Sequence, residues 1–129
     1  MDERQRVLAI VERGYRGVLE KQFFDELYLA TELHRQLGGL DLLLRGSAAS
    51  YALAAVPPPA LRVGNRSIAT LSDPRSGLRV LLDAGVGVWV EQPALTALGS
   101  PRPVLEGIRL AGEDEMAARW GEYRMVFFL

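Results

Sequence analysis

The chain has 129 residues, of which 49% are hydrophobic and 24% are charged, and its formal net charge is −1. This length and composition indicate one globular domain over residues 1–129, and the balanced charge offers no basic surface for nucleic acid. The sequence contains no cysteine and one histidine, which excludes disulfides, thiolate metal sites and persulfide carriers and disfavours histidine-based metal sites and hydrolase triads.

Residues 7–11, VLAIV, form a continuous run rich in β-branched side chains, as is typical of a strand covered on both faces. The run is too short for the apolar part of a signal peptide, and no stretch of the sequence is long enough to span a bilayer. We therefore expect a cytoplasmic protein that does not associate with membranes.

Residues 20–37 show the period of an amphipathic helix, with apolar side chains at spacings of four, three and seven: Phe23, Leu27, Ala30 and Leu37. Gly38 and Gly39 are expected to end this helix. Residues 40–44 then form a second apolar run, which predicts a second strand.

Ser47 is the expected N-cap of a short helix over residues 47–56, which the prolines at 57–59 end. The secondary structure of residues 60–71 is ambiguous from the sequence, and we interpret the segment as containing one short strand around Ile68. Ser72-Asp73-Pro74 is a strong helix start, and the apolar face of that helix consists of Leu78, Leu81 and Leu82.

Residues 85–99, GVGVWVEQPALTALG, predict a buried strand that ends at Glu91, followed by a short helix from Pro93 to Gly99. Residues 100–112 are expected to be a loop. Acidic residues at 113–115 favour the start of another helix, whose inward face would carry Met116, Trp120 and Tyr123. Residues 124–129 predict a terminal strand.

Strands rich in Val and Leu alternate with helices, and each connection is long enough for a parallel crossover. The sequence therefore predicts a three-layer α/β/α domain with a mainly parallel sheet of four or five strands.

Ligands of open parallel sheets bind beyond the carboxyl ends of the strands. In this chain those ends supply the residues of a candidate ligand-binding crevice: Glu12, Arg13, Arg45, Ser47 and Glu91. One interpretation is an anion or polar-ligand site, with Ser47 and backbone N–H groups at a helix N-terminus. The other is that charged side chains gather where strands reach solvent and pair with one another there.

The lone histidine, His34, lies on the apolar face of the first helix, where it is either a core or interface residue or a proton shuttle. Phe23-Phe24 and Phe127-Phe128 are adjacent aromatic pairs. Two neighbours on a strand point to opposite faces, so one aromatic of a pair serves a second covered layer or a subunit interface.

The phosphate-binding motifs are absent from the sequence. The glycines of GVGVWV lead into a strand instead of lying between a strand and a helix, and no G-x-x-x-x-G-K-[ST] occurs. A phosphoreceiver is also disfavoured, because no acidic pair ends the first strand. We expect no cofactor and no metal.

The second half of the chain, LLDAGVGVWVEQPALTALG followed by LEGIRLAGEDEMAARWGEYRMVFFL, resembles the DsrE-like sulfur-relay family, which includes the Tus and Dsr sulfurtransferase subunits. The family pattern matches residues 85–90, 93–99, 106–108, 114–123 and 125–129. The first half, residues 7–33, is similar to the family's first strand, glycine-containing loop and long helix. The resemblance implies the DsrE-like α/β fold and a tendency to form oligomers.

The resemblance also implies a departure from the family. In active members a cysteine at the strand end accepts sulfur as a persulfide, and here that position falls at or beside Glu91. A carboxylate cannot carry a persulfide, and no other cysteine replaces it. The resemblance thus points to a non-catalytic subunit, either self-assembled or bound to a cysteine-bearing paralogue.

Two other functions stay open. One is a small module that binds or senses a polar ligand in the strand-end crevice. The other is an enzyme that uses Glu91 as a general base, which would require a raised pKa that nothing in the sequence demonstrates.

Overall fold

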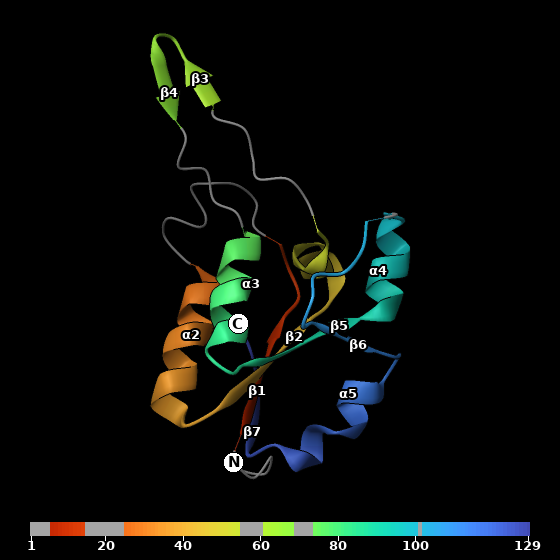
Figure 1. Cartoon of the computed structure of the whole chain (residues 1–129). Coiled ribbons are helices and arrows are strands. Elements are labelled where there is room, and N and C mark those ends of the chain that lie inside the picture. The colour runs from red at the N-terminus through yellow and green to blue at the C-terminus, as the bar shows by residue number, and fades with distance from the viewer. Residues whose placement is uncertain (1–5, 15–24, 55–60, 69–73, 101) are drawn as a thin grey trace.

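The computed structural model describes residues 6–14, 25–54, 61–68, 74–100 and 102–129 (Figure 1). Three features of the sequence lie outside these residues: the beginning of the helix expected over 20–37, with Phe23 and Phe24; the prolines at 57–59; and the expected cap residues Ser72 and Asp73.

Five parallel strands form the main sheet, in the order β6-β5-β2-β1-β7 (Figure 1). Their bounds are β1 Val7–Val11, β2 Leu40–Leu44, β5 Gly87–Glu91, β6 Arg109–Ala111 and β7 Met125–Phe128. Every residue of β1 and β2 is buried, as continuous apolar runs predict for strands covered on both faces. The expected α/β class with a mainly parallel sheet is confirmed, with five strands.

One face of the sheet carries most of the helical structure. Its elements are α2 Glu26–Leu37, α3 Pro74–Asp83, α4 Gln92–Leu98 and the 3₁₀ helix η2 Gly46–Ala52. Leu78 and Leu81 of α3 are fully buried against this face and Leu82 is partly buried, as the sequence predicts. The larger of the two hydrophobic cores lies here.

The opposite face is covered by a smaller set of residues that follow β6. Met116 of the short helix α5 (Glu115–Ala118) and Tyr123 pack there against Leu8, Ile10 and Leu43. Helices on both faces give the three layers.

Trp120 was expected on the inward face with Met116 and Tyr123, and this expectation is wrong. The helix α5 ends after one turn and the chain continues as the 3₁₀ helix η3 (Trp120–Glu122), so the predicted helical period does not extend to residue 120. The Trp120 side chain is 40% exposed.

The helix ends follow the local signals in the sequence. Asp25 caps α2, its Oδ1 accepting hydrogen bonds from the backbone N–H groups of Leu27 and Tyr28 at 3.1 and 3.2 Å. Gly38 ends α2 at φ 80°, and Gly99 ends α4 at φ 65°. Both glycines adopt the left-handed conformation that side chains with a Cβ disfavour.

The sequence missed one strand of the main sheet. Residues 100–112 were expected to be a loop, but Arg109–Ala111 pairs in parallel with Trp89–Glu91 as the edge strand β6. Two of its three residues are exposed, so neither a buried run nor a long alternation marks it as a strand.

Ser47 is not the N-cap of a helix over residues 47–56, as the sequence predicted. The segment Gly46–Ala52 is a 3₁₀ helix, Arg45 precedes it in extended conformation, and none of the described side chains caps it. The Ser47 Oγ instead accepts a hydrogen bond of 2.8 Å from the Gly14 N–H. The Ser47 Oγ is therefore hydrogen-bonded to the loop after β1, and it does not cap the helix that Ser47 belongs to.

A hairpin stands apart from the main sheet. Its strands are β3 Leu61–Val63 and β4 Arg66–Ile68, which among the described strands pair only with each other, in a separate two-stranded sheet. In Figure 1 the hairpin extends beyond α2 and α3. The strand expected around Ile68 is present, and β3 was not foreseen.

Among the described helices, none has the length and the apolar composition that crossing a membrane requires.

Candidate functional site

Three charged side chains from neighbouring strand ends meet at the carboxyl edge of the sheet. Glu12 follows β1, Arg45 follows β2, and Glu91 is the last residue of β5. The Arg45 Nε lies 3.2 Å from Glu91 Oε1, and its Nη1 lies 3.7 Å from Glu12 Oε1. Arg45 therefore bridges two carboxylates, because the parallel register places the ends of β1, β2 and β5 next to each other.

The ends of β1 and β2 approach each other closely beside this ion-pair cluster. Gly46 has φ 56°, and a Cβ added there would lie 2.6 Å from the backbone oxygen of Glu12. The Arg45 N–H also donates a hydrogen bond of 3.0 Å to the Val11 oxygen. Only glycine fits at position 46. The close contact between the ends of β1 and β2 also fixes the backbone of Arg45, and with it the place of the Arg45 side chain.

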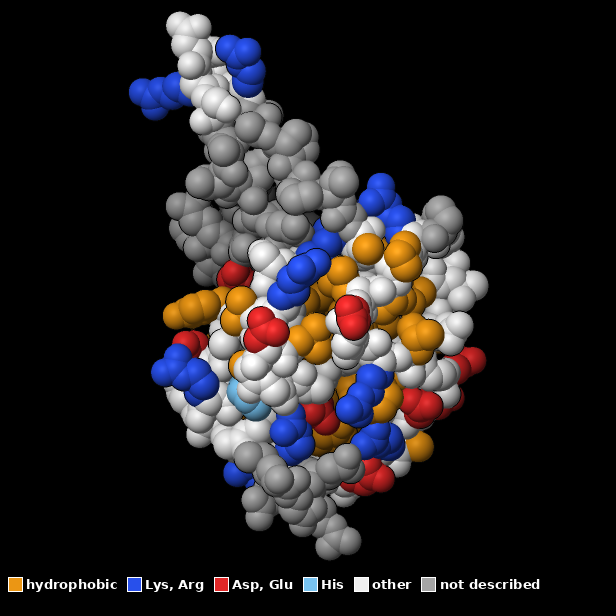
Figure 2. All heavy atoms as spheres, in the orientation of Figure 1, with side chains coloured by type: hydrophobic (Ala, Val, Ile, Leu, Met, Phe, Trp, Pro, Cys, Tyr) orange, Lys and Arg blue, Asp and Glu red, His pale blue; other side chains and the backbone are white. Residues whose placement is uncertain are grey.

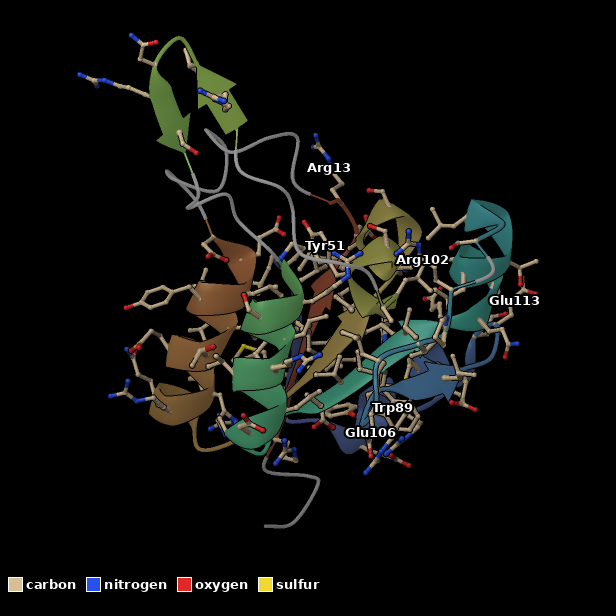
Figure 3. All side chains as sticks on the ribbon, turned by 45° about the horizontal axis from the view of Figure 1, so that its top comes forward. Arg13, Tyr51, Trp89, Arg102, Glu106 and Glu113 are labelled. Atoms are coloured by element: carbon tan, nitrogen blue, oxygen red, sulfur yellow. The ribbon has the colours of Figure 1, made fainter. Side chains whose placement is uncertain are left out.

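The two other residues predicted for the crevice, Arg13 and Ser47, have different positions. Arg13 is exposed and extends away from the body of the domain (Figure 3). Ser47 ties the loop after β1 to η2 through its hydrogen bond with Gly14. The structure thus brings together Glu12, Arg45 and Glu91, and the contact between these three agrees with the interpretation in which strand-end charges pair.

A cavity of about 180 Å³ lies beside the ion pair of Arg45 and Glu91. Its walls come from the ends of β2 and β5, the start of α4, and the segment from residue 113 to residue 120. The lining residues are Leu43, Arg45, Glu91, Pro93, Glu113, Asp114, Met116, Ala117 and Trp120. In Figure 3, Glu113 lies beside α4.

The residues at 113–120 were not predicted as part of the site. The sequence indicated only that the acids at 113–115 begin a helix. In the structure Asp114 is the N-cap of α5 at φ 60°, the only non-glycine residue with positive φ among those described. This turn brings Glu113 and Asp114 to the cavity wall. No local pattern in the sequence predicts this position.

Carboxylates outnumber guanidinium groups on the walls of this cavity. Glu91, Glu113 and Asp114 face it, and Arg45 is the one cationic side chain among the described residues that line it. Arg45 already contacts Glu12 and Glu91. Trp120 adds an aromatic wall, and apolar side chains complete the lining. Such a cavity suits a cationic or neutral polar group better than an anion.

Trp89 lies on the same face of the sheet, beneath two arginines. The guanidinium carbons of Arg109 and Arg119 lie 5.2 and 5.0 Å from the centre of its ring. Among the described residues, the buried Trp89 Nε1 has no hydrogen-bond partner. The arginines are placed for cation–π contact with the ring, so Trp89 is not an open stacking platform.

His34 links three elements at the other end of the sheet. The Leu40 N–H donates to its Nδ1 at 3.0 Å, which assigns the proton to Nε2, and Nε2 then donates to the Ala84 oxygen at 3.0 Å. His34 thus joins α2 to the start of β2 and the end of α3. Both ring nitrogens are engaged in these contacts, which favours the core interpretation over the proton shuttle.

The sequence also did not reveal the buried carboxylate of Asp41. This residue lies within the second apolar run, which predicts only a strand. Asp41 is 8% exposed, and its Oδ1 accepts a hydrogen bond of 2.9 Å from Arg6 Nε. The Tyr123 hydroxyl donates to its Oδ2 at 2.7 Å. Gly87 on the neighbouring strand leaves the space, since a Cβ there would lie 2.6 Å from Asp41 Oδ1.

No group of three or more His, Asp or Glu side chains within the described ranges is arranged to hold a metal ion.

No protein-family model and no curated protein matches the sequence. Among solved structures, the fold is similar to the crystal structure of the ychN protein from E. coli, with a TM-score of 0.73 and 20% identity. The alignment covers 97% of this chain and 99% of that chain. At this identity the likeness shows a shared fold.

Proposed function

We propose that this chain is a DsrE-like subunit with a structural or interaction role in a sulfur-relay-type oligomer, and that it does not itself carry sulfur. Two observations support the family. The motifs at residues 81–99 and 105–129 resemble the DsrE-like pattern, and the fold is shared with the ychN protein over almost the whole chain.

The observation that carries the non-catalytic role is the ion pair between Glu91 and Arg45. The resemblance places the family's sulfur-carrying cysteine at or beside Glu91. A carboxylate at this position cannot accept sulfane sulfur, and the sequence has no cysteine elsewhere. Because Arg45 also contacts Glu12, this strand end is a charge-paired cluster without a thiol.

The edge strand β7 supports an assembly. Phe128 is 55% exposed and Met125 is 44% exposed, and they lie on opposite faces of the strand. An apolar edge strand without proline or lysine is a natural surface for another subunit. The partner is a second copy of this chain or a cysteine-bearing paralogue.

Native mass spectrometry of the gently purified protein tests this proposal, because it reports subunit number and retained ligands together. We expect a ligand-free homo-oligomer, or a monomer that forms a stoichiometric complex with a cysteine-bearing paralogue. A monomer that carries a small bound mass and binds no paralogue would contradict it.

The cavity beside Arg45 and Glu91 favours a second candidate function, a module that binds a small polar ligand. A ligand that binds only the folded state raises the melting temperature, and the rise grows with the logarithm of the free ligand concentration above the dissociation constant. For a cationic or neutral polar ligand, Glu113→Gln should abolish this shift, whereas Glu106→Gln, outside the cavity, should leave it unchanged. A shift that survives Glu113→Gln would exclude this cavity as the site.

A further inference from the structure

Among the described elements, β3 and β4 make extensive contacts only with each other. All residues from 62 to 67 are exposed, including Val63 at 57%. A two-stranded hairpin in water is marginally stable, and three strands or packing against another element are normally needed. The hairpin therefore gains stability if a surface covers one of its faces.

The strand register gives the hairpin two unlike faces. Arg62 pairs with Ser67, and Val63 pairs with Arg66. Because residues directly opposite each other point to the same side, Val63 and Arg66 share one face, and Arg62 lies on the other. One face of the hairpin thus carries the exposed apolar side chain of Val63 directly opposite Arg66 on the other strand.

The charges of the hairpin are of one sign. Figure 2 shows basic side chains and no acidic ones on its described part, which agrees with the sequence of residues 61–68. The cavity beside α5 has the complementary character, because Glu91, Glu113 and Asp114 outnumber Arg45 there. Apolar surface and an aromatic wall from Trp120 border the same carboxylates.

We propose that the hairpin of one copy docks on this cavity of a second copy. The Arg66 guanidinium enters between Glu113 and Asp114, and Val63 packs at the rim beside Trp120. The contact is between copies, because the hairpin and α5 lie at opposite ends of the domain (Figure 1). A two-fold axis makes the docking reciprocal, so each dimer contains it twice.

This inference rests on the proposed function, since it requires that the chain assembles with itself. It adds the contact surfaces and the chemistry: a cation from a hairpin in a cavity lined by carboxylates. The exposed part of such a contact is screened by salt, so the dimer should dissociate as ionic strength rises.

Sedimentation velocity over a range of concentrations and salt tests the docking. Arg66→Glu should weaken the dimer by about tenfold or more, because it places a carboxylate among carboxylates. Arg62→Glu is the matched control, with the same charge change on the opposite face of the hairpin, and should alter the dissociation constant much less. The double variant Arg66→Glu/Glu113→Arg restores the opposite charges and should recover most of the lost affinity.

The outcomes separate this inference from the proposed function. A wild-type homo-oligomer that is equally stable with Arg66→Glu overturns the docking and leaves the structural-subunit role intact. Equal weakening by Arg62→Glu and Arg66→Glu also overturns it, because a general charge effect would then explain both. A wild-type chain that stays monomeric at all concentrations overturns the docking, and the structural role then depends on a paralogue.

The absence of cysteine allows a direct test of proximity. Asn65→Cys at the hairpin turn and Glu113→Cys at the cavity each introduce a single thiol. When the Asn65→Cys and Glu113→Cys proteins are mixed and oxidised, they should form a disulfide-linked heterodimer in high yield. Replacing the second variant with Gln36→Cys, which is exposed on α2, should give little product, and equal yields would contradict the docking.

Discussion

The hydroxyl of Tyr123 donates a hydrogen bond of 2.7 Å to Asp41, a residue 82 positions earlier in the chain. This bond ties the segment before β7 to the central strand β2. Arg6 holds the other oxygen of the same carboxylate. Asp41 is therefore a buried acid whose two oxygens are held by groups from both ends of the described chain.

Tyr123→Phe removes only the hydroxyl and should lower the free energy of unfolding by about 1.5–3 kcal/mol, because a hydrogen bond to a charged group is lost. Chemical denaturation measures this change. Tyr28→Phe is the matched control, since Tyr28 is 65% exposed, and it should have almost no effect. Equal effects of the two variants would show that the hydrogen bond contributes nothing.

Gly46→Ala should destabilise the fold more than Gly99→Ala does. Both glycines have positive φ, which costs a residue with a Cβ about 1–2 kcal/mol. Only at Gly46 would the Cβ also meet a backbone oxygen, at 2.6 Å, whereas at Gly99 no atom of the described residues lies within 4 Å. The additional overpacking cost is about 1–3 kcal/mol. Thermal and chemical unfolding compare the two variants, and similar losses would argue against the close approach of β1 and β2.

His34→Ala should cost about 2 kcal/mol of stability, because the Leu40 N–H loses its acceptor. His34→Asn should recover part of the loss, since its side-chain oxygen can take the place of Nδ1. Gln36→Ala, at an exposed position of the same helix, is the control. If His34→Asn is as unstable as His34→Ala, packing of the ring matters more than the hydrogen bond.

Glu91→Cys tests whether this strand end is where the family's thiol would stand. The new thiol would lie beside the Arg45 guanidinium, which favours the reactive thiolate. Its alkylation should be several-fold faster than that of Thr96→Cys, on the exposed side of α4, and adding Arg45→Gln should remove the advantage. Equal alkylation rates for the Glu91→Cys and Thr96→Cys variants would contradict the proposed placement of Glu91 at the sulfur position of DsrE-like proteins.

The sequence by itself determined the elements whose signals are local. The apolar runs at residues 7–11 and 40–44 are buried strands, because a strand covered on both faces has no polar side to display. Gly38 and Gly99 end helices because they adopt the left-handed conformation at low cost. The alternation of such strands with helices was sufficient for the α/β class.

The site was only partly predictable. Strand ends of a parallel sheet meet at one edge, so the fold class predicts that Glu12, Arg45 and Glu91 share that edge. The strand order β5-β2-β1 decided that they are neighbours. The tertiary structure decided that Ser47 binds the loop at Gly14, and that Asp114 turns toward the cavity at φ 60°.

The remaining features depend on register and on contacts between distant segments. The edge strand β6 is three residues long and forms only because Trp89–Glu91 lies beside it. Asp41 is tolerated in the core only because Arg6 and Tyr123 reach it and Gly87 leaves it space. A local pattern records the burial and backbone preference of each residue, whereas the partner of a side chain is set by the pairing of strands far apart in the chain.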